Sequence, residues 1–566
     1  MHSKISLVNK EIGKIIFRSV GWISIIYFLG LFLVFPLEIL RSTSEEHREY
    51  MWRENLFQFN FDFQFILSIS IPVLMAIFLF RFLHVKSYSD LIHSLPVKRE
   101  SVFHQYTLIG LVLLITPILA NALIIIALYK PLNLADFFTV GDIFQWLMTT
   151  ILFNILIFFA GVFVGMLCGI SAAQGVLTYI ALLLPSGMLV LLIYNLPYYL
   201  YGFPEQYFMQ RKVEVFSPLV RFYFIAERPL ELVEIIVYVL LLIALYGLSL
   251  FLYKNRKLEA VSQALVFPVL KPFFKYGTTF CTMLLGGMYF GQMERNTAWV
   301  IVGYLFGAVI GYFIAEMVLQ KSWRIIIHIK GLLVYSGIIA VLAFLFQVDF
   351  TYYEKTVPPL NEIERVHLSS NYYFYNDNEN SFFLKEVENI ELISRLQKEI
   401  IANKNSNKRS PNNENAFFVY ELKNGKKIVR NYLIDKKDYA HFYKFIHESD
   451  EFKQTTNPVL QVKADQIEKM TIHPNGPIYK RTVIIDPNDL QEAVSILQDE
   501  VYSATYEDTQ DERDSYSNIV IVQKNKKNFS LDWRVSYKKF ESWLTKKGLL
   551  DDARINARRY YLCLYR

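Results

Sequence analysis

The sequence predicts a polytopic α-helical membrane protein followed by a soluble α+β domain. Apolar runs of span length recur through the first 348 residues, and the chain is 53% hydrophobic with a mean hydropathy of +0.26. About 20 helical residues cross a hydrocarbon core roughly 30 Å thick. Residues 349–566 instead alternate strand-like and helical runs, with 33 Lys+Arg against 33 Asp+Glu. We therefore expect a transmembrane domain at 1–348 and an extracytoplasmic domain at 349–566.

About nine spans are predicted in the first domain. The first apolar run continues for span length without a small-residue cleavage site, so we expect it to be retained and not removed as a signal peptide. The seventh and ninth runs are short, and a total of eight or ten spans would move the C-terminal domain across the membrane. The apolar runs cover residues 19–37, 64–83, 107–128, 146–168, 175–194, 232–253, 277–292, 297–318 and 331–347.

The distribution of Lys and Arg predicts the orientation. Residues 1–348 hold 25 Lys+Arg and 19 Asp+Glu. With the N-terminus inside, the cytoplasmic segments carry 15 of these cations and the outer segments carry nine, as the positive-inside rule favours. We expect a multi-pass protein of the cell membrane with a cytoplasmic N-terminus and a C-terminal domain outside. Because the cations lie between apolar runs and form no single stripe, we expect no nucleic-acid partner.

Few polar residues interrupt the predicted spans. Glu316 and Arg81 lie near cytoplasmic ends, while Asn121 and Asn154 lie within spans. These polar residues are compatible with two interpretations. They could line a substrate or proton path, or they could anchor the helices and form interhelical hydrogen bonds. The second is favoured, because no ionisable pair is evident near the midplane.

The connection between the second and third predicted spans contains a short amphipathic helix. Its sequence is YSDLIHSLPVKRE, with apolar residues at helical spacing and a proline that ends the turn before three charged residues. An ordinary interfacial helix and a docking element for a cytoplasmic partner are both compatible with this pattern. The residues of the candidate docking element are Tyr88, Leu91, Ile92, Leu95, Pro96, Lys98, Arg99 and Glu100.

Three segments together carry a resemblance to a known family. They are SLPVKRE after the second span, FPVLKPFFKYG before the seventh and GYFIAEMVLQKSWR at the end of the eighth. Over most of residues 1–355 the chain resembles permease subunits of ABC transporters of the type 2 export class from Gram-positive bacteria. The resemblance implies a separate cytoplasmic ATPase, a coupling helix at residues 88–100, and a second permease copy or a paralogue. The family's core has six spans. Spans seven to nine and the C-terminal domain are additional to this core, so the resemblance does not define the transport path.

No catalytic motif is present in the sequence. The phosphate-binding pattern G-x-x-x-x-G-K-[ST] is absent, and the nearest string, NGKK from Asn424 to Lys427, is a predicted hairpin turn. We therefore expect no enzyme activity and no cofactor in this chain, with ATP and magnesium bound by the partner ATPase. The three cysteines are too scattered for a zinc site or a disulfide framework. The histidines His367, His441, His447 and His473 lack metal-ligand spacing and are expected at the solvated surface.

The C-terminal domain is predicted to contain two copies of one hairpin-and-helix module, at about 356–455 and 460–550. Asn424-Gly425 is a strong hairpin signal, and a second hairpin is expected around Asn525, 101 residues later. In the second module, Asp486-Pro487 supplies a cap and a first-turn proline for a helix. Strands are expected at 362–368, 382–385, 417–433 as a hairpin, 466–472, 479–485 and 518–534 as a hairpin; helices are expected at 387–403, 435–448, 486 onward and 537–547.

Three functions are weighed on these observations. The leading hypothesis is an ABC permease subunit that exports or clears an amphipathic, lipid-like or peptide substrate at the lipid membrane. The alternative is a membrane sensor whose outer domain binds a ligand and signals to a cytoplasmic partner without net transport. A membrane enzyme is the least favoured function, because the sequence contains no recognisable catalytic motif.

Overall fold

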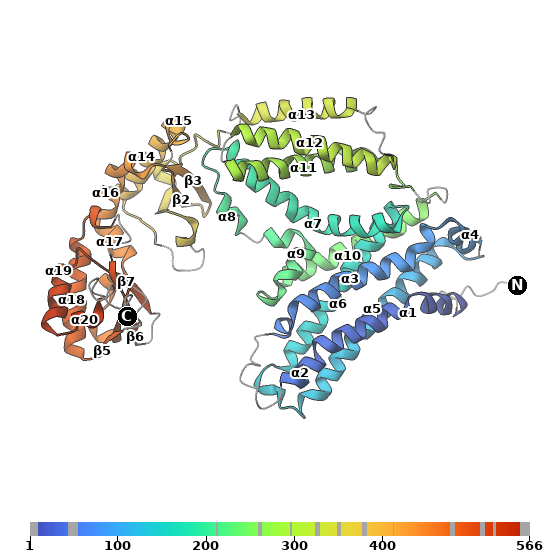
Figure 1. Cartoon of the computed structure of the whole chain (residues 1–566), viewed down its shortest axis with the longest axis horizontal. Helices are drawn as coiled ribbons and strands as arrows, with labels where there is room; N and C mark the ends of the chain where they lie inside the picture. Colours follow the sequence, from blue (N-terminus) through green and yellow to red (C-terminus); the bar gives the residue numbers. More distant parts are fainter. Residues whose placement is uncertain are drawn as a thin grey trace, which may run out of the picture. The chain divides into compact units, whose positions relative to one another are not determined.

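The chain divides into two compact units. One unit contains Met1–Leu196 and Phe208–Phe344, and the other contains Pro197–Tyr207 and Leu345–Arg566. Helices and strands of both units are labelled in Figure 1. The computed structural model describes residues 10–42, 55–94, 96–210, 213–257, 263–294, 297–322, 329–347, 352–375, 382–410, 412–475, 481–509, 515–524 and 528–554.

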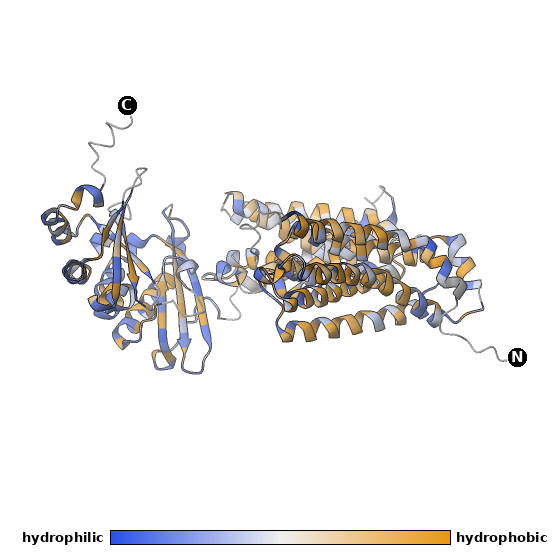
Figure 2. Cartoon of the chain, turned by 90° about the horizontal axis from the view of Figure 1, so that it is seen from below, coloured by the Kyte–Doolittle hydropathy of each residue, from blue (hydrophilic) through white to orange (hydrophobic). Residues whose placement is uncertain are grey.

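The first unit is a bundle of long apolar helices (Figure 2). They are α1 (Lys10–Val34), α3 (Phe61–Leu79), α5 (Arg99–Tyr129), α6 (Val140–Leu167), α7 (Ser171–Asn195), α10 (Leu232–Asn255), α11 (Leu270–Glu294), α12 (Thr297–Gln320) and α13 (Ile329–Gln347). Shorter helices connect them, namely α2 (Pro36–Ser42), α4 (Lys86–Ser94), α9 (Pro218–Tyr223) and the 3-10 turns η2 (Leu56–Gln58), η3 (Phe80–Leu83), η4 (Leu134–Asp136), η6 (Val213–Phe216) and η7 (Phe224–Ala226). The 3-10 turn η5 (Leu196–Tyr198) and the helix α8 (Glu205–Met209) overlap Pro197–Tyr207 of the other unit.

Seven helices in the described part of the chain are long and apolar enough to cross a membrane. They coincide with seven of the nine predicted spans and cover Gly13–Ser42, Phe61–Leu83, Arg99–Tyr129, Val140–Leu167, Ser171–Tyr198, Leu232–Asn255 and Thr297–Gln320. The other two predicted spans are helical as well, as α11 and α13. However, α13 has only a short apolar stretch, Ile329–Leu345, and α11 carries Lys, Gly, Thr and Tyr residues that lower its hydropathy. The count of about nine is therefore not confirmed.

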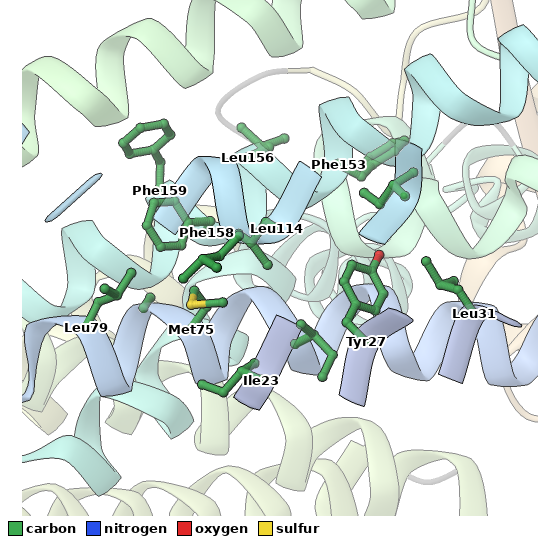
Figure 3. Close-up of a cluster of buried hydrophobic side chains, with 14 of the residues drawn as sticks. Ile23, Tyr27, Leu31, Met75, Leu79, Leu114, Phe153, Leu156, Phe158 and Phe159 are labelled. Atoms are coloured by element: carbon green, nitrogen blue, oxygen red, sulfur yellow. The ribbon is translucent and has the colours of Figure 1, made fainter. Parts of the chain in front are cut away.

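The core of the bundle lies between α1, α3, α5 and α6 (Figure 3). Ile23 and Tyr27 of α1 face Met75 of α3 and the Phe153 and Phe158 side chains of α6, all fully buried. α6 is the central helix, because 72% of its most apolar window is buried inside the protein. Its first turn is fixed by a capping box in which Thr139 and Asp142 satisfy each other's backbone N–H groups.

Polar side chains inside the spans make interhelical hydrogen bonds, as predicted for Asn121 and Asn154. Asn154 accepts the hydroxyl of Tyr27 at 3.0 Å, and Asn121 donates to the carbonyl of Phe28 at 3.3 Å. Glu316 also has a partner that the sequence analysis missed. The Lys275 ammonium donates to it at 2.9 Å, joining α11 to α12 by an ion pair. These contacts fit the reading of anchoring and helix association.

The second unit contains two antiparallel sheets with helices packed on them. The first sheet has the order β1-β2-β3, formed by β1 (Ile363–Ser369), β2 (Glu414–Leu422) and β3 (Lys427–Ile434). The β2–β3 hairpin turns at Gly425, whose φ of +79° requires glycine, so the predicted turn at Asn424-Gly425 is confirmed. Its helices and turns are η10 (Leu360–Glu362), η11 (Tyr372–Phe374), α14 (Val387–Ala402), α15 (Lys404–Asn407), η12 (Lys436–Tyr439), α16 (Ala440–Glu448) and α17 (Asp450–Thr456).

The second sheet follows the same connectivity about 100 residues later. Its order is β5-β4-β6-β7, with β4 (Ile467–Pro474), β5 (Thr482–Ile484), β6 (Ser515–Gln523) and β7 (Phe529–Arg534). Its helices and turns are η13 (Pro458–Gln461), η14 (Ala464–Gln466), α18 (Pro487–Ser503), η15 (Glu507–Thr509), α19 (Lys538–Lys546) and α20 (Leu550–Ala553). We call the first sheet with its helices module 1 and the second module 2.

One strand of this unit differs from the sequence analysis. The strand expected at 382–385 is reduced to a single bridge between Leu384 and Val366, although it occupies the place of β5 in module 2. The turn residue Asn525 lies outside the described residues. The side chain of Asp486 accepts N–H groups of the first turn of α18, as predicted.

Candidate functional site

The predicted coupling element is the helix α4, which follows η3 and precedes α5. Residues Lys86–Ser94 form this helix. Ile92 is buried at 7% exposure, whereas the adjacent Leu91 is 59% exposed. Tyr88 is half-buried and meets the ring of Phe82 edge-on at 6.2 Å. The predicted apolar face is therefore divided, because Ile92 and Tyr88 hold α4 on its own protein and Leu91 alone of these three points outward.

The outward face of α4 is mostly polar. Leu91 is surrounded there by residues at helical spacing, namely Lys86, Ser87, Asp90 and Ser94, all exposed. Pro96 and Lys98 are exposed in the turn that follows, while Leu95 lies outside the described residues. A partner that binds α4 from outside would therefore meet one aliphatic side chain and several polar groups.

A histidine joins α4 to the end of α10. Nδ1 of His93 lies 2.8 Å from the Ser89 carbonyl within α4, and its Nε2 lies 3.3 Å from the hydroxyl of Tyr253. With the proton on Nδ1, the ring donates to Ser89 and accepts from Tyr253. Burial, the largest effect, lowers the pKa of His93 and favours this neutral form. The ring of Phe82 contacts both His93 and Tyr253, so apolar surface packs against the contact between α4 and α10.

The charged residues after α4 are attached to the same end of α10. Arg99 donates to the carbonyls of Lys254 at 3.4 Å and Arg256 at 3.1 Å. Glu100 forms an ion pair with Lys254 at 2.7 Å, where both side chains are largely exposed. Of the predicted site residues, Arg99 and Glu100 are therefore occupied by contacts within this chain.

Arg256 is the residue of this region that the sequence analysis missed. Its guanidinium is buried and donates to the carbonyls of Gly165 at 2.8 Å, Met166 at 2.9 Å and Leu83 at 2.9 Å. These carbonyls belong to the last turns of α6 and η3, where helix C-termini leave acceptors free and favour a cation. Burial, the main cause, lowers the pKa of Arg256 to about 10, so the side chain stays charged at neutral pH.

The first turn of α7 meets η3 beside this arginine. Nδ1 of His84 lies 3.0 Å from the hydroxyl of Ser171, and burial together with the charge of Arg256 lowers the pKa of His84 to about 4. A hollow of about 510 Å³ lies next to this contact. It is lined by Ile77, Phe78, Arg81, His84, Val85, Gly169, Ile170, Ser171 and Ala172.

No metal-binding cluster is found among the described residues. They contain no group of three His, Cys, Asp or Glu side chains that could hold a metal ion. Of the histidines expected at the surface, His441 and His473 are exposed, His447 is half-buried and His367 is fully buried. Its Nδ1 donates to the carbonyl of Phe382 at 2.7 Å among aromatic rings, which makes it part of the core. The surface expectation for His367 was wrong, because both faces of β1 are covered: Val366 and Leu368 are buried on one face, and His367 packs against Tyr375 and Phe417 on the other.

The C-terminal unit includes a segment from far earlier in the chain. Residues Pro197–Tyr207, which directly follow α7, group with Leu345–Arg566. We call this segment the strap. The Gly202 carbonyl accepts the N–H of Asn431 at the outer edge of β3, at 3.0 Å. No local pattern in the sequence indicates this contact, because the strap and β3 lie more than 200 residues apart.

The comparisons with known proteins identify one region only. A family model described as a domain of unknown function, DUF6449, matches residues 420–565. The match begins within β2, so it covers part of module 1 and the whole of module 2. No curated protein and no solved structure matches the chain.

Proposed function

We propose that this chain is the membrane-spanning permease subunit of an ABC transporter, driven by a separate ATPase that binds ATP and magnesium. Its substrate is amphipathic, lipid-like or peptide, and is exported or cleared from the membrane. A second copy of the chain or a paralogue completes the complex. The chain crosses the cell membrane about nine times, with a cytoplasmic N-terminus and an extracytoplasmic C-terminal domain. Support comes from the apolar helices, the missing phosphate-binding motif and the geometry of α4.

The geometry of α4 carries the proposal. A coupling helix has to be short and fixed to the membrane helices, so that it passes on a displacement instead of absorbing it. α4 has nine residues, and contacts through Ile92, His93 and Tyr88 fasten it to η3 and α10. At the same time Leu91 remains exposed for a partner.

The first experiment identifies the partner. The full chain is purified from its native membrane in mild detergent, and the co-purifying proteins are identified by mass spectrometry. We expect an ATPase with a phosphate-binding motif in stoichiometric amount. Recovery of the chain with no such ATPase, from membranes in which transport or resistance is active, would contradict the proposal.

The second experiment tests α4 itself. Leu91→Asp should weaken ATPase binding by about tenfold or more, because interface anchors each contribute roughly 1 to 3 kcal/mol. Val387→Asp is the matched control, since Val387 is 74% exposed at the start of α14 in the C-terminal unit. Unchanged ATPase binding and turnover in Leu91→Asp would leave α4 as an interfacial helix only. Ile92→Asp should instead destabilise the membrane unit, because Ile92 is buried.

A sensor without net transport is the second candidate function. The observation that favours it is that the strap, which follows the long apolar helix α7, belongs to the C-terminal unit. ATP turnover that responds to an added ligand, without movement of that ligand across a sealed vesicle, would support the sensor over the transporter.

A further inference from the structure

The strap crosses the edge of module 1 and places one tyrosine on each face of the sheet. On the helix-covered face, the ring of Tyr201 packs on Tyr432 with centroids 5.1 Å apart. On the opposite face, Tyr207 joins Phe417 and Tyr375 in a separate buried cluster. Tyr201 and Tyr207 are 8% and 4% exposed. The strap thus packs against both faces of the sheet at its β3 edge.

Gly202 sets how closely the strap approaches. Its φ is +84°, and a Cβ at this position would lie 2.5 Å from the ring of Tyr432. Any other residue would be strained in its backbone and would also collide with the ring. The main-chain bond from Asn431 to Gly202 therefore depends on glycine.

A second connection to the membrane unit arrives at the same place. Glu354, in the segment that follows α13, accepts the N–H of Tyr201 at 2.7 Å and also binds the ammonium of Lys404. The preceding Tyr353 stacks under the guanidinium of Arg430 at 3.9 Å, and its carbonyl accepts from the same group at 3.1 Å. Module 1 therefore holds both chain segments that lead to the membrane helices.

The helix that enters the strap is α7, and its other end touches the residues before α4. α7 has 25 residues, which corresponds to a length of about 37 Å. At its start, Ser171 binds His84, and Gln174 donates to the carbonyl of Gly161 at 3.0 Å. His84 is separated from the first residue of α4 by Val85 alone.

The far end of α7 is also held in defined contacts. Asn195 donates to the carbonyl of Leu284 in α11 at 3.1 Å and accepts the hydroxyl of Tyr304 in α12 at 2.7 Å. Pro185 interrupts the hydrogen bonding of α7 near its middle, and the adjacent Ser186 donates to the carbonyl of Val213. α7 therefore has fixed ends and one site at which it can bend.

We propose that module 1 is a built-in regulator of the membrane unit, which acts by pulling on the strap and passing the displacement along α7 to η3 and α4. The final step, from α4 to the ATPase, rests on the function proposed above. The steps from strap to η3 do not depend on it.

The test compares amide hydrogen exchange in the full chain, held in lipid nanodiscs, between wild type and strap variants. Gly202→Val should release the strap from β3. We expect at least threefold faster exchange in residues 197–207, and also in residues 84–94 and 168–175 at the other end of α7. Glu354→Gln should give the same pattern more weakly, because it removes the charge at the junction and keeps the side-chain shape. Glu388→Gln, an exposed carboxylate on α14, is the matched control and should change neither region.

The outcomes separate the two proposals. If Gly202→Val and Glu354→Gln accelerate exchange only in the strap and module 1, with residues 84–94 as in wild type, regulation through α7 is overturned. Should Gly202→Val fail to fold, Glu354→Gln decides alone. Hydrogen exchange needs no ATPase, so a coupled response at residues 84–94 together with absent ATPase binding would remove the proposed function and leave this inference standing.

Discussion

Arg256 carries its charge into a buried position where it bonds three carbonyls. We expect Arg256→Met to lower the free energy of unfolding of the membrane unit by on the order of 2–3 kcal/mol, because hydrogen bonds to charged groups are strong and the buried acceptors would be left unpaired. Lys257→Met is the control, since Lys257 follows directly and is exposed. Thermal unfolding of both variants in detergent measures the difference. Equal melting temperatures would show that water satisfies these carbonyls.

His367 should make the C-terminal unit sensitive to acid. Burial, the main cause, lowers its pKa from 6.5 to about 4 in the folded protein. Between these values the unfolded chain binds the proton and the folded chain does not, so stability falls as pH falls from about 6.5 to 4. His367→Gln should therefore lose less melting temperature than wild type between pH 7 and pH 5. Part of the dependence should remain, because burial also lowers the pKa of His447 to about 4.

A matched change at His473 checks this prediction. His473 is exposed on β4, so His473→Gln should follow the wild-type pH dependence. If His367→Gln and wild type lose the same melting temperature between pH 7 and pH 5, the buried histidine is not the group that titrates.

At the scale of single residues, the sequence located the candidate site but did not assign the roles of its members. Helical spacing placed Leu91 and Ile92 in one apolar set, although one is exposed and the other buried. Periodicity gives the faces of a helix, and the neighbours that cover each face are set by tertiary contacts. Arg256 was counted among the cations that orient the chain, because a sequence does not reveal which of several nearby cations finds buried carbonyls.

At the scale of elements, the sequence predicted most helices and strands of both units. In the C-terminal unit, the elements predicted from hydrophobic alternation, from the Asn424-Gly425 turn and from the Asp486 cap agree with the observed elements to within a few residues. These signals are local, so a short window of sequence contains them. Composition does not identify α11 as a span, because glycines stand where α11 packs closely against α12.

The contact between α11 and α12 depends on small residues. A Cβ on Gly303 would lie 2.3 Å from the carbonyl oxygen of Gly286, so the helices touch backbone to backbone. Gly303→Val should force them apart and lower the melting temperature of the membrane unit by several degrees, since overpacking costs about 1–3 kcal/mol. Gly247→Val on α10, where a Cβ meets nothing within 4 Å, is the control. Equal melting temperatures in the two variants would contradict this reading of the interface.

The strap restricts how the helices after it cross the membrane. Because the strap and residues 345–566 form one unit, they lie on the same side of any membrane. The chain between them must therefore cross an even number of times. α10 and α12 are apolar enough to cross, so α11 and α13 either both cross or both do not. Nine spans and seven spans satisfy this condition, and eight do not.

Single cysteines tested with an impermeant thiol reagent on intact cells distinguish these cases. After replacement of the native cysteines, labels at Gln206 in the strap and at Asn424 should both react from outside. With nine spans, Met293 at the end of α11 reacts and Lys321 after α12 does not; with seven, the pattern at these two positions is reversed. We expect the nine-span pattern. Reaction of only one of Gln206 and Asn424 would contradict the even count itself.

At the scale of the whole molecule, the division into two units differs from a simple cut of the sequence. Composition changes near residue 349, and the compact units change at Leu345. The strap could not be predicted, because its partners are distant in sequence and Tyr201, Gly202 and Tyr207 look like an ordinary loop. A contact between a loop and a sheet edge has no periodicity, so only the folded chain reveals it.

This arrangement predicts how the C-terminal unit behaves when it is separated from the membrane helices. A fragment of residues 352–566 contains both sheets and their cores, and its only cysteine is Cys563, so we expect a soluble, folded domain without disulfides. The fragment lacks the strap, which leaves Tyr432, Phe417 and the N–H of Asn431 uncovered. A synthetic peptide of residues 197–207 should bind there and stabilise the fragment by mass action.

The expected rise in melting temperature depends on the apolar area that the strap buries and on the hydrogen bond that it forms with the N–H of Asn431. Each 1 kcal/mol of added stability raises the melting temperature by about 2–4 °C in a domain of this size. We expect a rise of several degrees at millimolar peptide, measured by circular dichroism, and no rise with a peptide that carries Gly202→Val. The mutant peptide keeps both tyrosines, so it distinguishes the fit at β3 from general hydrophobic binding. If both peptides stabilise the fragment equally, or neither does, the strap is not the element that completes module 1.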